Sequence, residues 1–203
     1  MKRFKTYWKQ QDILLFEQDS KSIKHNSTGD IITEDPKHLD NFWSWFGNSK
    51  MVDSEGRPQV WYHVTTTKFT SFDVGRGSGV AGQGIYLTNQ KFDDDRYGDV
   101  EMQLYVHCEN PLDLIGDDKI NEHAITMGLV GLYDLRTIPQ MREWSKDFRN
   151  GMLKLGYDGC FVMPQGGRKG EKHLVVYKPH QVKSVNNTGD FSNSDDIMTE
   201  DTP

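Results

Sequence analysis

Short runs of β-branched and aromatic residues recur along the chain, separated by turn-forming residues. This pattern predicts β-strands, because such residues suit a pleated, half-buried surface and the runs are too short for helices. The five predicted strands lie at 59–63, 84–88, 102–108, 159–163 and 173–177.

Two longer stretches, 118–132 and 139–155, have the residue spacing of helices. In the second, Pro139 falls in the first turn and Gly156 lies just past the end, and each residue favours that helix boundary. A shorter helix that Gly47 ends is predicted around an apolar cluster, which we expect to be core rather than a ligand site. Its members are Leu39, Phe42, Trp43, Trp45 and Phe46.

The predicted strands outnumber the helices and do not alternate with them regularly. This order favours an α+β fold with a mainly antiparallel, split sheet and flanking helices over a doubly wound fold. The 203 residues fit one domain of ordinary size, which we place at 39–188. Residues 1–38 are predicted to form a partly polar N-terminal extension, and residues 189–203 an acidic C-terminal tail.

The charge of the chain is concentrated near its C-terminus. Of the net charge of −6, five negative charges follow Lys183, where no further Lys or Arg occurs. The rest of the chain is therefore close to neutral. A strongly basic surface for binding nucleic acid is not indicated.

Both cysteines, Cys108 and Cys160, lie in apolar strand-like runs, where a buried free thiol is the ordinary interpretation. Two cysteines in such places argue against a disulfide framework or a zinc site. The apolar run at 13–16 is far too short for a signal peptide, and no segment approaches membrane-spanning length. We therefore expect a soluble, intracellular protein.

Three residues are candidates for chemistry, because each sits in its own local motif. His63 lies in Val-Trp-Tyr-His-Val-Thr-Thr at 60–66, Tyr86 in Gly-Gln-Gly-Ile-Tyr-Leu-Thr at 82–88, and Tyr97 in Arg-Tyr-Gly at 96–98. Two aromatic faces can hold a planar ring, and a strand-end imidazole can bond a hydroxyl. Taken alone, the histidine would ordinarily be a satisfied polar residue and the tyrosines half-buried core residues.

In this order and spacing, the motifs resemble the H-Y-E class of ADP-ribosyltransferases, the branch of diphtheria toxin and poly(ADP-ribose) polymerase. The chain is most similar to the small ADP-ribosyltransferase domains of phage polyvalent proteins and bacterial effectors. The resemblance covers roughly residues 42–197. It includes Trp-Phe-Gly-x-Ser-Lys at 45–50, Asn-Pro-Leu at 110–112, Gly-Tyr-Asp-Gly at 156–159 and Pro-x-Gln-Val-Lys-Ser at 179–184.

The resemblance implies that NAD is a substrate, which donates ADP-ribose, and that no metal is needed. Tyr97 would stack on the nicotinamide, and Tyr86 would shape the pocket behind it. His63 would contact an NAD ribose, with Thr65 supporting the same pocket. Val64 stands where family members commonly have glycine, and its backbone would contact the nicotinamide amide.

A glycine-rich stretch at 73–84 precedes Tyr86 and could fold over NAD. Within it Arg76 would face a phosphate, and Gly84 opens the strand that carries Tyr86. The alternative is an ordinary flexible connection. The Gly-x-Gly here is no dinucleotide-binding fingerprint, because no helical pattern follows it.

The last motif departs from the family pattern. His173 stands where the family has its catalytic glutamate, six residues before Pro179, and the nearest carboxylate is Glu171, on the same face of an extended strand. Both are candidate catalytic residues. A neutral imidazole at 173 could accept a hydrogen bond from the ribose 2″-hydroxyl. An imidazolium there would repel the positive charge that develops on the ribose. A glutamate restored at 173 is expected to raise activity. If neither residue proves catalytic, Glu101 and Asp158 come next.

Arg168 and Lys169 lie just ahead of this strand, where family members carry a target-reading loop. A solvated turn is an equally good interpretation of these two residues.

We predict an NAD-dependent mono-ADP-ribosyltransferase that modifies a macromolecule, a host or bacterial protein rather than a nucleic acid, and releases nicotinamide. The change at His173 leaves open a catalytically silent NAD-binding module, and a nucleic-acid target and a structural virion or scaffold domain are further alternatives. No membrane partner is expected. The predicted location is the cytoplasm of a bacterial or phage-infected cell, with a secreted effector as the alternative.

Overall fold

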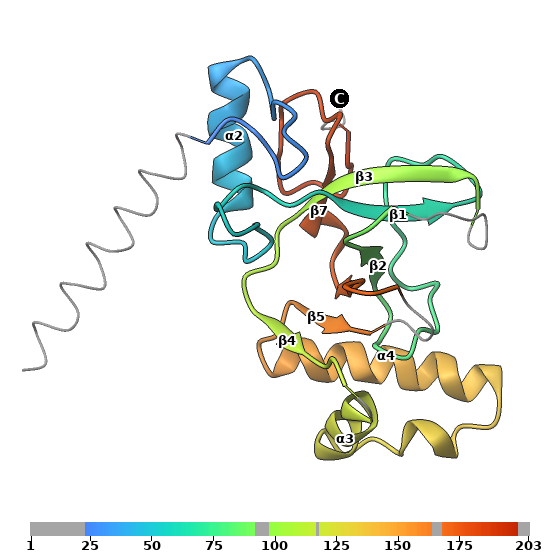
Figure 1. Ribbon diagram of the computed structural model, residues 1–203. Helices are drawn as coiled ribbons and strands as arrows, with labels where there is room; N and C mark the ends of the chain where they lie inside the picture. The colour runs from blue at the N-terminus through green and yellow to red at the C-terminus, as the bar shows by residue number, and fades with distance from the viewer. Residues whose placement is uncertain (1–22, 92–97, 117, 164–167, 199–203) are drawn as a thin grey trace, which may run out of the picture.

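The computed structural model describes residues 23–91, 98–116, 118–163 and 168–198. Within these residues, seven strands form one sheet in the order β4-β5-β6-β2-β1-β3-β7, flanked by helices (Figure 1). Neighbouring strands are antiparallel except β4 and β5, which are parallel. The elements are α2 (Pro36–Phe46), β1 (Trp61–Thr65), β2 (Ile85–Thr88), β3 (Val100–Val106), β4 (Pro111–Asp113), α3 (Lys119–Thr126), η1 (Leu132–Asp134), α4 (Ile138–Lys154), β5 (Gly159–Val162), β6 (His173–Val176), η2 (Pro179–Gln181) and β7 (Val182–Ser184).

The predicted α+β class with a mainly antiparallel sheet is confirmed. Strands β1, β2, β3, β5 and β6 lie within two residues of the bounds expected from the sequence. The three-residue strands β4 and β7 were not predicted, because a run that short shows no alternation of polar and apolar residues.

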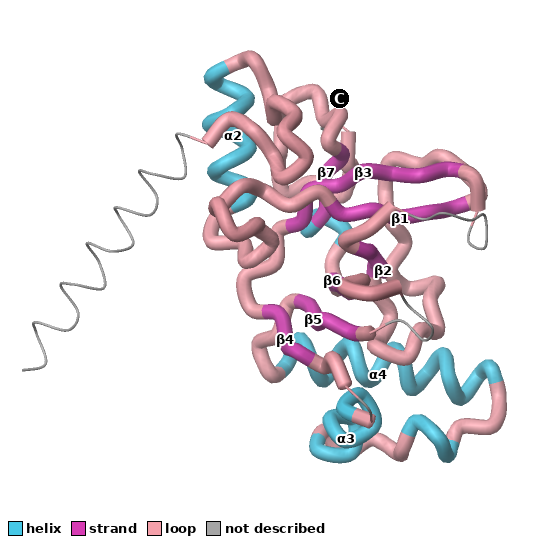
Figure 2. Tube along the Cα trace, viewed as in Figure 1, coloured by secondary structure: helices cyan, strands magenta, loops and turns pink. Residues whose placement is uncertain are grey.

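The core consists of two apolar clusters on either side of the central strands. Helix α4 lies along one end of the sheet, next to β4 and β5, and α2 lies at the other end, near β3 and β7 (Figures 1 and 2). Strand β6 contributes Leu174 and Val176 to the larger cluster and Val175 to the smaller one. Because side chains alternate between the faces of a strand, a strand covered on both faces needs this unbroken apolar sequence.

Helix α4 has the boundaries that its sequence predicts. Thr137 caps it by accepting a hydrogen bond from the backbone N–H of Gln140, and Pro139 occupies the first turn. Beyond the helix, Gly156 has a φ of +87°, which favours glycine. The buried face contains Trp144, Ser145, Phe148 and Met152, a spacing of about one turn.

The other helices agree less uniformly with prediction. Helix α2 confirms the expected aromatic helix: the Asp35 carboxylate accepts hydrogen bonds from the backbone N–H groups of Lys37 and His38. The helix expected at 118–132 is shorter, since α3 ends at Thr126 and Gly128 follows with a φ of +79°. The chain then forms the separate 3₁₀ turn η1.

Side chains on both flanks of the range 39–188 pack into the larger cluster. Ile32 precedes this range, and Phe191 and Ile197 follow it; all three are buried. Asn26 is also buried and donates a hydrogen bond from Nδ2 to the hydroxyl of Tyr105, at 3.0 Å. The packed core thus extends beyond the predicted domain range, and the division into extension, domain and tail stays a prediction.

A buried lysine holds the acidic C-terminal segment in place. Lys183 on β7 is 1% exposed, and its ammonium donates to the carbonyl oxygens of Ser194, at 3.0 Å, and Asp196. A buried ammonium needs such acceptors, because leaving it unpaired would cost several kcal/mol, on the order of 3 to 5. The segment after β7 therefore serves as the cover of a buried charge.

Cys108 and Cys160 are buried free thiols, as predicted. Burial raises the pKa of Cys160 to about 12, so this thiol stays protonated. Among the described helices, none has both the length and the apolar character needed to cross a membrane.

Candidate active site

His63 lies in the middle of β1 and reaches across to the neighbouring strand. Its Nδ1 lies 2.9 Å from the carbonyl oxygen of Tyr86 on β2. A carbonyl only accepts hydrogen bonds, so Nδ1 carries the proton. Burial lowers the pKa of His63 and thereby favours the neutral imidazole. In this form Nε2 is an acceptor that can receive a hydroxyl proton.

The His63 hydrogen bond falls where the sheet divides. Strands β1 and β2 are paired at a single position, Tyr62 with Thr88, whereas β1 pairs with β3 over five positions. Next to that single pair, the Tyr86 carbonyl is bonded by the side chain of His63. This is the split expected of the fold.

Two phenylalanines that the sequence analysis did not single out surround the His63 ring. Phe72 lies edge-on at 5.0 Å between ring centroids, and Phe69 at 6.3 Å. These rings remove water from the imidazole and limit its rotation. In the sequence they look like ordinary core residues, so no signal distinguished them.

Tyr86 holds the glycine-rich loop with its hydroxyl group. The hydroxyl donates to the carbonyl of Gly82 at 2.9 Å and accepts from the backbone N–H of Ala81 at 3.1 Å. Burial raises the pKa of Tyr86 well above its ordinary value, so the phenol is neutral. A Cβ atom at Gly79 would overlap the hydroxyl, so glycine is required there.

The remaining predicted NAD-contacting residues have different surroundings. Gly84 lies against β6, where a Cβ atom would come within 2.6 Å of the Val176 carbonyl oxygen. Arg76 is exposed and forms an ion pair with Asp73 at 3.0 Å. Val64 and Thr65 are half-buried at the end of β1.

Tyr97 lies outside the described residues. The next residue, Gly98, packs so closely on the backbone of Thr65 that a Cβ atom there would overlap the Thr65 carbonyl. The segment that follows Tyr97 in sequence therefore returns to the end of β1, where Val64 and Thr65 lie.

Glu171 lies between His173 and Arg168 and contacts both of them. His173 Nε2 lies 3.2 Å from Glu171 Oε1, and Glu171 Oε2 accepts from the Arg168 backbone N–H at 2.9 Å and from its Nε at 3.4 Å. Burial raises the pKa of Glu171, but the hydrogen bonds from Arg168 and His173 outweigh it and hold the pKa below its ordinary value. The carboxyl group is therefore ionised at neutral pH.

The segment before β6 is fixed by two side chains that follow β2. Asn89 donates from Nδ2 to the carbonyl of Gly170 at 3.1 Å and accepts from the N–H of Lys172 at 2.8 Å. Gln90 donates to the carbonyl of Lys169 at 3.3 Å, while the Lys169 residue is exposed. Arg168, by contrast, uses its side chain internally.

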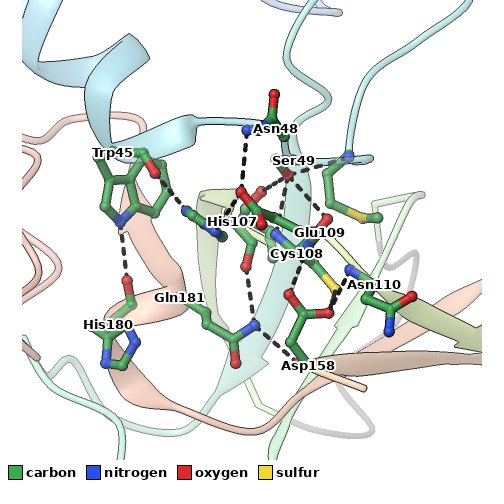
Figure 3. Close-up of polar contacts among 12 residues, drawn as sticks. Trp45, Asn48, Ser49, His107, Cys108, Glu109, Asn110, Asp158, His180 and Gln181 are labelled. Carbon is green, nitrogen blue, oxygen red and sulfur yellow. Dashed lines mark hydrogen bonds and ion pairs between the residues drawn. The ribbon is translucent and has the colours of Figure 1, made fainter. Parts of the chain in front are cut away.

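Asp158, one of the two fallback carboxylates, belongs to a structural network (Figure 3). One of its oxygens accepts from the backbone N–H of Asn110 at 2.8 Å and lies 3.1 Å from Cys108 Sγ. The other accepts from the N–H of Glu109 at 2.7 Å. Gln181 donates to the Asp158 carbonyl at 2.9 Å. With both oxygens occupied, Asp158 joins the turn after β3 to the turn before β5.

A groove of about 770 Å³ adjoins Phe69. Strand β3 and the segments 68–70, 184–186 and 197–198 contribute to its lining. Of the described candidate residues, only the fallback carboxylate Glu101, on β3, lines it. The groove is of a size typical of small-molecule pockets. Since Phe69 also contacts the His63 ring, the groove is a neighbour of the site rather than part of it.

Among the described residues, no group of three or more His, Cys, Asp and Glu side chains is placed to hold a metal ion.

A split, mainly antiparallel sheet with a histidine on β1 and a tyrosine on β2 defines an ADP-ribosyltransferase fold. The family model described as ADP-ribosyltransferase in polyvalent proteins matches residues 53–191, and the chain belongs to this family. The resemblance seen in the motifs is confirmed. No curated protein and no solved structure matches the chain.

Proposed function

We propose that the protein transfers a single ADP-ribose from NAD to a protein acceptor and releases nicotinamide. The family uses NAD as its substrate. The observation that carries the proposal for this chain is the neutral His63, which is bonded to the Tyr86 carbonyl and offers Nε2 at the split of the sheet.

In this reaction the bond between the nicotinamide nitrogen and ribose C1″ breaks, and nicotinamide leaves with the bonding electrons. The ribose becomes an oxocarbenium ion, as in glycoside hydrolysis. A nucleophile of the acceptor then bonds to C1″ and loses its proton to solvent. The chain can assist by holding the ring, bonding the ribose hydroxyls and placing negative charge near C1″.

We assign these roles to the predicted residues. Tyr86 and Tyr97 hold the nicotinamide, and His63 Nε2 accepts a ribose hydroxyl. The ionised Glu171 and His173 support the cation from the start of β6. Since His173 stands in place of the family's glutamate and the nearby Glu171 is paired, this arrangement favours single transfer over chain elongation.

A protein acceptor suits the charge of the chain better than a nucleic acid. The net charge is −6, and the side chain of Arg168 is bonded to Glu171. A polyanion would gain little from such a surface. Two free thiols suit a reducing compartment, which favours the cytoplasm as the place of action.

The direct test is incubation with labelled NAD and host lysate, with nicotinamide release measured in parallel. Tyr97→Ala should weaken NAD binding by about 1 to 3 kcal/mol in calorimetry, since it removes a ring-stacking surface. Tyr133→Ala, at an exposed tyrosine of η1, is the matched control and should bind NAD normally. A folded wild-type protein with neither label transfer nor nicotinamide release would exclude the proposal.

A second candidate is an NAD-binding module without chemistry. It is favoured by one observation: both oxygens of Glu171 already have partners, so this carboxylate is not free for the substrate. This candidate predicts NAD binding in calorimetry together with no release of nicotinamide. A scaffold domain would bind no NAD at all.

A further inference from the structure

Arg168, Glu171 and His173 form a chain of contacts, at the end of which His173 Nδ1 has no partner among the described residues. We propose that His173 Nδ1 contacts the NAD ribose, and that Glu171 and Arg168 are positioning residues that act through it. This proposal rests on the proposed function. It assigns the role of the family's catalytic glutamate to the His173 imidazole, which the Glu171 carboxylate holds in place.

The Glu171 carboxylate is occupied by protein groups. Oε1 bonds His173 Nε2, and Oε2 bonds both the backbone N–H and Nε of Arg168. Its side chain is 7% exposed, compared with 18% for His173. A ribose hydroxyl would have to displace one of these partners to reach Glu171, whereas it can approach His173.

The contact with Glu171 selects one tautomer of His173. An ionised carboxylate only accepts hydrogen bonds, so the proton lies on Nε2. In the neutral imidazole the lone pair of Nδ1 is then available, and within the described part of the chain Nδ1 has no hydrogen-bond partner. A ribose hydroxyl is a donor that matches this acceptor.

His63 has the same arrangement with the two ring nitrogens exchanged. Its Nδ1 is bonded to the Tyr86 carbonyl, and Nε2 is the available acceptor. Strand β2 lies between β1 and β6, and Tyr62, Thr88 and His173 form one row across them. Adjacent strands are about 4.8 Å apart, so the backbones at Tyr62, the residue before His63, and at His173 lie about 10 Å apart on either side of β2.

Arg168 fixes the carboxylate in turn. Its guanidinium also donates to the carbonyl of Lys91, so the side chain spans two segments. Asn89 and Gln90 hold the backbone of the same loop. A side chain held at both ends suits a positioning role better than recognition of a target.

The first test measures the tautomer and needs no turnover. In ¹⁵N-histidine-labelled protein, the His173 signals, assigned by their loss in His173→Asn, should show a protonated Nε2 and an unprotonated Nδ1. Glu171→Gln places an amide NH₂ group beside Nε2, so the proton should move to Nδ1 in a folded protein. Lys172→Gln, at an exposed neighbour, should leave the spectrum unchanged. A wild-type protein protonated on Nδ1, or a Glu171→Gln spectrum like that of the wild type, would overturn the proposal.

The second test asks which ring nitrogen matters. The Oδ1 atom of Asn occupies the position of Nδ1, and the amide of Gln reaches the position of Nε2. His173→Asn should therefore keep more nicotinamide release than His173→Gln, which should lose about 100-fold in kcat. Equal loss in both variants, with both folded by circular dichroism, would refute a role for Nδ1.

Glu171→Gln should lower kcat by about 100-fold with little change in the KM for NAD, because it inverts the tautomer, as in the wrong-tautomer variants of catalytic triads. Arg168→Gln should lower kcat less, about 10-fold, since Glu171 keeps its contact with His173. A change in KM alone would overturn the positioning role. If the wild type transfers no ADP-ribose, the proposed function fails. The tautomer measurement still shows whether Glu171 holds the proton of His173 on Nε2 or whether the proton lies on Nδ1.

Discussion

Removal of one oxygen from Tyr86 tests whether its hydroxyl organises the glycine-rich loop. Tyr86→Phe keeps the ring but deletes the hydrogen bonds to the Gly82 carbonyl and from the Ala81 N–H. Each such bond contributes about 1 kcal/mol, so the free energy of unfolding should fall by about 2 kcal/mol. For a domain of this size, that corresponds to a decrease in Tm of about 4 to 8 °C.

The matched control is Tyr105→Phe, at a tyrosine in the larger cluster. Its hydroxyl has one described partner, Asn26 Nδ2 at 3.0 Å, so the loss in stability should be about 1 kcal/mol. Thermal unfolding and NAD calorimetry should be measured on both variants. We expect both to lose stability and only Tyr86→Phe to bind NAD more weakly, because only its loop belongs to the proposed site.

Gly79→Ala should reproduce the binding defect by a different route, since the added methyl group would push the Tyr86 phenol from its place. The reasoning would be refuted if Tyr86→Phe kept wild-type stability. It would also be refuted if the two Tyr→Phe variants weakened NAD binding equally.

Three further predictions follow from buried or paired charges. The pKa of His63 is lowered in the folded protein, so stability that is present above about pH 6.5 should be lost as the pH falls. His63→Asn keeps a donor at the δ position but does not titrate. The Tm of this variant, measured over a series of pH values, should therefore fall less than that of the wild type. Lys183→Met should lower the free energy of unfolding in urea by about 2 kcal/mol, because the carbonyl oxygens of Ser194 and Asp196 lose their donor. Lys178→Met, at an exposed position, should change it by less than about 0.5 kcal/mol. His173→Glu should raise nicotinamide release above that of the wild type, but it would place a second carboxylate beside Glu171. Adding Glu171→Gln removes that repulsion, so the double variant should be faster than the single one. A single variant faster than the double variant would contradict this.

Much of the fold could be predicted, because local rules act strongly at particular residues. Pro139 and Gly156 set the ends of α4, and the five longer strands have apolar runs that suit no other element. Strand β4 could not be found in this way, since it exists only through its parallel pairing with β5. Its three residues carry no pattern of their own.

The flanks of the domain were harder to predict for a different reason. Five acidic residues after Lys183 indicated a solvated tail, because charge is the strongest signal in a short polar segment. Phe191 and Ile197 are nevertheless buried, and the Lys183 ammonium binds backbone carbonyls there. Composition registers side-chain charge, whereas backbone carbonyls and apolar side chains help to hold this segment.

At the candidate site, spacing was sufficient to identify residues but not their partners. Glu171 and His173 were expected on one face of a strand, and the structure places them in contact. The role of Arg168 could not be inferred, because a basic residue in a glycine-rich turn is compatible with both a target-reading loop and an internal ion pair. Its bonds to Glu171 favour the internal role, and recognition of the acceptor by Lys169 stays a prediction.

An imidazole placed between a carboxylate and the ribose has a cost that can be estimated. A carboxylate about 4 Å from a unit positive charge contributes about 4 kcal/mol at an effective dielectric constant of about 20, and about 2 kcal/mol at about 8 Å. A loss of about 2 kcal/mol in transition-state stabilisation is about 30-fold in rate. The dyad of Glu171 and His173 would therefore retain part of the electrostatic effect at lower speed. Such a site suits an enzyme that modifies each acceptor once, because a single transfer needs less turnover than the growth of a polymer.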